Sequence, residues 1–227
     1  PGIMGSELAV GSDKVWVDIL DLMFGGLKKL RLNGATVTAT APITRYYGDI
    51  IEFLGQTHKV VPFPFDWRLP IEQEADRLAK NLQQEFEEAK AHGHPIRILA
   101  HSMGGLVART MIARHNALWR EVCAQPGARL VMLGTPNGGS HAITELLIGR
   151  SSLMSKLALL DVTHSKDKLN EIVNKFPGVL SMLPVDPRED YFSSDTWKQY
   201  AKYSQGRWSA PGSEGLAKAR SFRTILD

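Results

Sequence analysis

The chain has 227 residues, of which 43% are hydrophobic and 22% charged, a balance typical of one folded domain, or a domain with a cap, rather than a disordered chain. Its formal charge is only +3, and because the basic excess is spread along the sequence we expect no nucleic-acid partner. The single cysteine, Cys123, excludes an internal disulfide framework. No stretch approaches about 18 uncharged apolar residues, so we expect no transmembrane helix within this chain.

The first elements are predicted from local composition. Residues 1–14 are small and polar and predict a loop, and the apolar stretch over 15–30 predicts a helix. Alternating β-forming residues then predict a strand over 36–40. A helix over 47–54 and a second strand over 59–63 follow.

The middle of the chain alternates clearly between helix and strand. Residues 71–91 place their apolar side chains on one helical face. Strands are predicted over 96–100 and 129–133, separated by a tight turn at 101–105 and a helix over 106–115. This alternation predicts an α/β fold with a mostly parallel sheet flanked by helices.

The pattern changes after about residue 141. Leucine and methionine residues between 146 and 160 predict helix, whereas 176–184 and the aromatic stretch 191–208 look irregular. No strand is predicted there. We therefore divide the chain into a core over residues 1–140 and an α-rich cap over 141–227.

The segment Ala100-His101-Ser102-Met103-Gly104 fits the nucleophile elbow of α/β-hydrolases, with alanine at the first glycine position. The motif is weak alone, but it requires an apolar strand before the serine and a helix after it, and both are predicted. Small flanking residues avoid collisions across a strained turn, and the helix N-terminus favours a developing oxyanion. Ser102 is therefore the candidate nucleophile; the alternative is a glycine-rich turn that binds phosphate or only turns the chain.

An oxyanion hole in this fold needs a second backbone amide from a loop near the start of the sheet. The segment Pro1-Gly2-Ile3-Met4-Gly5-Ser6 can supply it. The two donors would be the amides of Met103 and Ile3, with Met4 a weaker choice than Ile3. An ordinary glycine loop is the alternative interpretation of this segment.

Two further loops are expected at the carboxyl edge of the sheet, where ligand crevices form in open α/β folds. Residues 65–68 can wall a pocket or act as a structural clamp, and residues 133–140 can line the pocket or form the hinge into the cap. The predicted pocket residues are Met4, Asp66, Trp67, Arg68, His101, Thr135, Pro136 and Asn137.

Four segments together resemble the lecithin:cholesterol acyltransferase family of α/β-hydrolase lipases: PGIMGS at 1–6, FDWR at 65–68, AHSMGGLVAR at 100–109 and LGTPNGGS at 133–140. The segment FPGVLSMLP at 176–184 resembles the cap of that family, whereas Phe65 departs from it, since tyrosine is frequent there. The resemblance implies a serine enzyme that hydrolyses acyl esters, or transfers the acyl group to an alcohol, through an acyl-enzyme. It implies a lipid or other acyl-ester substrate and leaves a membrane or lipid surface open as a partner.

A serine nucleophile needs a histidine base and an acid, which in this fold follow the serine in the chain. The histidines after Ser102 are His115, His141 and His164. His115 ends the elbow helix and is expected in solvent. Asp161 and His164 have the right order, but no predicted strand precedes them. We therefore expect the chain to be truncated at both ends, with the acid and histidine beyond Asp227. The alternative is a catalytically inactive hydrolase fold used as a binding module.

No metal or cofactor is predicted. His92 and His94 flank a turn without ligand-like spacing of carboxylates or cysteines. The loop over 134–140 lacks the lysine of a Walker-type phosphate site. The sequence leaves oligomeric state and localisation open.

Overall fold

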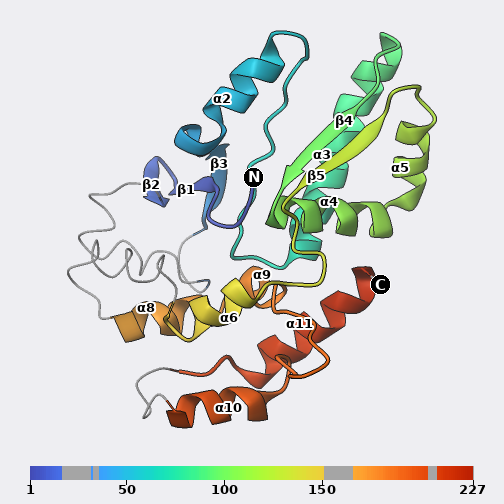
Figure 1. Ribbon diagram of the computed structural model, residues 1–227. Coiled ribbons are helices and arrows are strands. Elements are labelled where there is room, and N and C mark those ends of the chain that lie inside the picture. Colours follow the sequence, from blue (N-terminus) through green and yellow to red (C-terminus); the bar gives the residue numbers. More distant parts are fainter. Residues whose placement is uncertain (17–31, 33–35, 151–165, 204–208, 227) are drawn as a thin grey trace.

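The structure, a computed structural model, describes residues 1–16, 32, 36–150, 166–203 and 209–226 (Figure 1). It is a mixed α/β arrangement whose described strands form two sheets. A three-stranded antiparallel sheet has the order β2-β1-β3, and a parallel pair has the order β4-β5. The strands are β1 (Ser6–Val10), β2 (Asp13–Trp16), β3 (Thr38–Pro42), β4 (Arg97–His101) and β5 (Arg129–Leu133).

The prediction of a loop over 1–14 is wrong, because β1 and β2 form a hairpin there. Gly11 and Ser12 connect Val10 to its partner Asp13, and Gly11 has a φ of +59°. A two-residue turn with glycine first matches the right-handed twist of paired strands. The predicted helix from residue 15 is also wrong at Val15, which lies in β2; residues 17–31 lie outside the described residues.

The expected single, mostly parallel sheet is not what the described strands form. β3 begins two residues later than predicted and pairs antiparallel with β1. Residues 59–63 form no strand, and Pro62 and Pro64 have no amide hydrogen to donate to a neighbouring strand. Parallel pairing is confined to β4 and β5, which align from Arg97 opposite Arg129 to His101 opposite Leu133.

The helices of the first half follow the predicted periodicity closely. They are α2 (Thr44–Gly55), α3 (Ile71–Ala91), α4 (Met103–Arg114) and α5 (Asn116–Cys123), of which α5 was not predicted. α3 has the predicted bounds and buries Ala75, Ala79 and Phe86, while α4 is buried along most of its length. In contrast, Leu99 and Leu133 of the parallel pair are 43% and 50% exposed.

The C-terminal part is helical, and the described residues beyond 140 contain no strand. Its helices, below the parallel pair in Figure 1, are α6 (His141–Leu147), α8 (Lys166–Val173), α9 (Pro177–Leu180), α10 (Ser194–Tyr203) and α11 (Ser213–Leu226). α10 overturns the expectation that 191–208 is irregular, because Trp197 is fully buried and its Nε1 donates to the Tyr191 carbonyl. The helix predicted within 146–160 is described only as far as residue 150.

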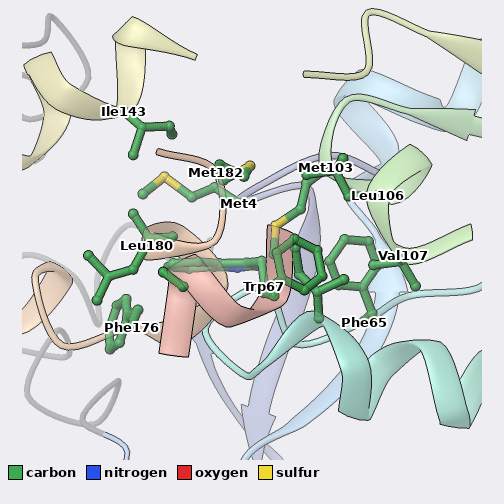
Figure 2. Packing of buried hydrophobic residues seen from close by; sticks show 14 of the residues in the cluster. Met4, Phe65, Trp67, Met103, Leu106, Val107, Ile143, Phe176, Leu180 and Met182 are labelled. Atoms are coloured by element: carbon green, nitrogen blue, oxygen red, sulfur yellow. The ribbon is translucent and has the colours of Figure 1, made fainter. Parts of the chain in front are cut away.

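One hydrophobic cluster joins the two parts of the chain (Figure 2). Trp67 and Met103 from the first half pack with Phe176 and Met182 from the second, and the Trp67 and Phe176 ring centroids lie 5.6 Å apart. The predicted division at residue 140 is therefore crossed by a shared core. The boundary between core and cap at residue 140 remains a prediction.

Candidate functional site

Ser102 occupies the single residue between β4 and α4, so the strand–turn–helix context that the elbow motif requires is present. Its φ of 52° and ψ of −124° lie outside the regions that a side chain favours. Its amide donates to the Leu133 carbonyl at 2.8 Å, and its carbonyl accepts from Gly105 at 3.0 Å. Neighbouring structure on both sides therefore holds the strained residue, which is half-buried.

The glycines around Ser102 are required by neighbouring loops. A Cβ at Gly104 would lie 2.5 Å from the Pro1 carbonyl oxygen, and one at Gly105 would overlap the Thr135 side chain. A Cβ at Gly2 would lie 3.0 Å from the Ser102 Cβ. The sequence predicted small residues beside Ser102 because bulky ones would collide across the elbow itself. In the structure, side chains at these glycines would also collide with the N-terminal loop and the 133–140 loop.

The N-terminal loop turns tightly beside Ser102. The Gly5 amide donates to the Gly2 carbonyl at 3.1 Å, and Met4 has a φ of 56°, which is the sign that a type II turn requires at its third residue. The Met4 carbonyl accepts from Trp16 Nε1 at 3.1 Å. This turn contains the amide of Ile3, one of the two predicted oxyanion donors. The other predicted donor, the amide of Met103, is the first of α4 and directly follows Ser102 in the chain.

Tyr47, on α2, connects this turn to the elbow, and the sequence analysis did not select it. Its hydroxyl accepts from the Gly2 amide at 2.8 Å and lies 2.9 Å from Nδ1 of His101. Burial raises the pKa of Tyr47 above its usual value, a shift that the Gly2 amide partly opposes. His101 itself is exposed. Nothing in the local sequence distinguishes Tyr47 from its neighbour Tyr46, because the contact joins residues far apart in the chain.

Asp66, Trp67 and Arg68 lie in the protein interior. Arg68 donates to both carboxylate oxygens of Asp66, at 2.9 and 2.6 Å, and both side chains are less than 5% exposed. The Arg68 carbonyl accepts from the Gly178 amide at 3.2 Å. Trp67 packs edge-on against Trp16 and Phe176, and its Nε1 has no hydrogen-bond partner among the described residues. This segment thus connects the core to α9.

The loop over 133–140 contacts both α4 and α11. Thr135 packs over Gly105, and its buried hydroxyl has no hydrogen-bond partner within the described part of the chain. Pro136 accepts from the Gly139 amide at 2.9 Å. Asn137 accepts from Arg109 through its side chain and from Arg223 through its carbonyl, contacts that the sequence analysis did not predict.

The described histidines that follow Ser102 in the chain have carboxylate partners of their own. His115 is not free in solvent, since its Nε2 lies 2.7 Å from Asp76 Oδ1. His141 lies 3.1 Å from Asp186, whose pKa is held well below its usual range, chiefly by hydrogen bonds from Arg188 and also by His141. No described histidine hydrogen-bonds the Ser102 hydroxyl, and the pair Asp161 and His164 lies outside the described residues.

Across the residues that the structure describes, no group of three or more histidine, cysteine, aspartate or glutamate residues is placed to hold a metal ion. Nor does any described helix combine the length and apolar character needed to cross a membrane.

Comparison with known proteins identifies a family to which the chain is similar. The family model described as lecithin:cholesterol acyltransferase matches residues 43–210, which is more than half of the 227-residue chain. The matched region contains Tyr47, the 65–68 segment, Ser102, the 133–140 loop and α9, and it excludes the N-terminal turn. Among curated proteins no sequence matches the chain.

Proposed function

Since the chain belongs to the lecithin:cholesterol acyltransferase family, whose activity is of the lipid acyltransferase or phospholipase type, we propose that it acts on lipid acyl esters through an acyl-enzyme on Ser102. One observation carries this proposal: Ser102 is held at a φ of 52° between a parallel strand and a helix, with a glycine turn packed against it. A nucleophile elbow of the α/β-hydrolase type requires a serine in this strand–turn–helix context, which is why the observation supports the proposal.

The proposed reaction has two steps. The Ser102 oxygen attacks the ester carbonyl carbon while its proton passes to a base, and the tetrahedral intermediate then expels the alcohol with a proton to leave an acyl-enzyme. In the second step water or an acceptor alcohol loses a proton to the base and attacks the acyl carbon, and the bond to the Ser102 oxygen then breaks; the acid or the new ester leaves, and Ser102 regains its proton. The amides of Met103 and Ile3 are proposed to bind the oxyanion in both steps; an unpaired amide at the first turn of α4, at the positive end of the helix dipole, suits this role.

The base and its acid are to be sought outside the described residues, because no described histidine bonds Ser102. The predicted pocket residues divide by environment. Met4, His101, Thr135 and Pro136 belong to the elbow itself or to the two loops that pack on it, and we propose that they line the acyl-ester site. Asp66, Trp67, Arg68 and Asn137 are buried or bonded to neighbouring elements, and we propose that they fix the walls of that site.

The test uses the protein that carries this chain, with p-nitrophenyl butyrate as substrate and a fluorophosphonate probe for the nucleophile. Ser102→Ala is expected to abolish both turnover and labelling, because the attacking oxygen is lost. Ser221→Ala, an exposed serine on α11, is the matched control and is expected to retain both.

Two results would contradict the assignment. Labelling of Ser102→Ala at the rate of the unaltered protein would show that another residue is the nucleophile. Absence of turnover and labelling in the unaltered protein would favour the second candidate function, an inactive hydrolase fold that binds lipid or another partner.

A further inference from the structure

We propose that Tyr47 is a positioning residue that fixes the oxyanion turn against the nucleophile through its hydroxyl. The inference rests on the proposed function of Ser102 and adds a residue to its machinery. Tyr47 touches neither the ester nor the reacting atoms in this proposal. It acts through Gly2 and through His101, the residue before the serine.

The hydroxyl of Tyr47 joins three segments that are distant in the chain. It lies 2.8 Å from the Gly2 nitrogen and 2.9 Å from His101 Nδ1. A hydroxyl has one proton and two acceptor lone pairs, so it can accept from the Gly2 amide and donate to the imidazole at the same time. The Tyr47 and His101 rings also meet edge-on, with centroids 5.9 Å apart. One side chain of α2 thereby holds both the N-terminal turn and the end of β4.

The bonded turn is packed directly on Ser102. A Cβ built at Gly2 would lie 3.3 Å from the Ser102 hydroxyl oxygen, so the Gly2 backbone packs closely against the side chain of the nucleophile. A Cβ built at Gly5 would lie 2.9 Å from the Tyr47 hydroxyl, so the hydroxyl sits against the turn from Gly2 to Gly5. The Ile3 amide follows Gly2 immediately, and its direction depends on how this turn is held.

The position of an oxyanion donor is catalytically important. Preorganised donors stabilise charge that develops in the transition state, and removing one donor costs about 10²–10³-fold in kcat. Tyr47 orients an oxyanion donor and is not itself a donor. Loss of its hydroxyl is therefore expected to lower kcat less than removal of a donor would, by about 10–100-fold. Burial raises the pKa of Tyr47 above its usual value, and this direction favours the protonated hydroxyl that the bridge requires.

The chain supplies a matched control on the same helix. Tyr46 precedes Tyr47, is 69% exposed and differs from it in environment rather than in chemistry. We expect Tyr47→Phe to lower kcat for p-nitrophenyl butyrate by about 10–100-fold with KM changed less than about threefold, and Tyr46→Phe to change neither. Loss of the hydroxyl's hydrogen bonds would lower Tm by only about 2–4 °C.

Fluorophosphonate labelling separates positioning from damage to the fold. A displaced oxyanion turn slows labelling of every molecule, so Tyr47→Phe is expected to reach the same final extent of labelling at a lower rate. A loss of folded protein would instead lower the final extent. Unchanged kcat, a lowered final extent, or a Tyr47→Phe protein that does not fold would each overturn the proposal.

Ser102→Ala, assayed in the same experiment, distinguishes a failure of the proposed function from a failure of the proposed role of Tyr47. If Ser102→Ala retains turnover, the proposed function fails and this inference fails with it. If Ser102→Ala is inactive and Tyr47→Phe has the kcat of the unaltered protein, only the positioning role of Tyr47 is refuted.

Discussion

Replacing Arg68 by methionine tests whether the buried Asp66–Arg68 pair is a structural clamp or a substrate-binding group. The pair is bidentate, with Nε–Oδ1 and Nη2–Oδ2 distances of 2.9 and 2.6 Å. The side chains of Arg68 and Asp66 are only 3% and 4% exposed. Because each charge already has an opposite charge as its partner in the interior, we predict that the pair stabilises the fold and does not bind substrate.

The expected loss follows from the burial of the pair. Removing one partner of a buried ion pair leaves an uncompensated charge and costs about 3–5 kcal/mol. Asp66 would keep the Arg68 backbone amide, 3.1 Å from its Oδ1, so the lower end of that range is expected for Arg68→Met. In a domain of this size each kcal/mol shifts Tm by about 2–4 °C. The predicted decrease in Tm is therefore about 6–12 °C.

Two further variants sharpen the interpretation. Arg68→Lys retains the charge but cannot make the planar bidentate contact, so an intermediate loss is expected. The double variant Asp66→Leu with Arg68→Met removes both charges, and it is expected to be more stable than Arg68→Met alone because no unpaired carboxylate remains.

Thermal and urea unfolding measure the stability changes, and kcat/KM for p-nitrophenyl butyrate is measured at a temperature where every variant is folded. We expect kcat/KM of Arg68→Met to stay within about threefold of the unaltered protein. A stability loss below about 1 kcal/mol would refute the clamp. So would a much larger fall in kcat/KM in fully folded protein, which would assign Arg68 to substrate binding.

Two more predictions follow from the structure. Gly2→Ala places a Cβ 3.0 Å from the Ser102 Cβ, so we expect it to lower kcat strongly with little effect on Tm. Gly138→Ala is the control, because a Cβ at Gly138 meets no atom within 4 Å, and it is expected to change neither kcat nor Tm. Equal kcat values of the two variants would contradict the close packing of Gly2 on Ser102. Asp76 has a pKa lowered chiefly by the hydrogen bond from Arg114, so its contribution to stability is present above about pH 4 and is lost as pH falls further. Asp76→Asn should therefore reduce the difference in unfolding free energy between pH 6 and pH 3, and an unchanged difference would show that this carboxylate does not contribute to acid sensitivity.

The parts of the fold that the sequence predicts well are those set by local chemistry. The apolar stripe of residues 71–91 defines α3 to the residue. The two apolar runs that became β4 and β5 are bounded by turn-forming residues on both sides. Ser102 falls between strand and helix as the elbow motif predicts, because a sharp turn with glycines leaves few alternatives.

The remaining differences depend on partners that are distant in the chain. Residues 1–14 contain a hairpin signal in Gly11-Ser12, but β1 becomes a strand through pairing with both β2 and β3. Residues 59–63 have β-forming side chains, yet no neighbouring strand pairs with them in the described structure. Tyr47 likewise has no sequence signature, since its role depends on Gly2 and His101 being brought to it.

The strain at Ser102 bears on the choice between an active enzyme and an inactive binding module. A non-glycine residue in such a conformation costs about 1–3 kcal/mol, and the surrounding contacts from Leu133 and Gly2 are needed to hold it. Glycine would adopt the same φ and ψ without that cost. A module that only binds would gain nothing from a serine at this position, whereas a nucleophile must project its hydroxyl from the turn toward the carbonyl carbon of the substrate. A serine held in this strained conformation therefore supports the proposed enzyme over the inactive binding module, and the strained backbone is the physical reason for that preference.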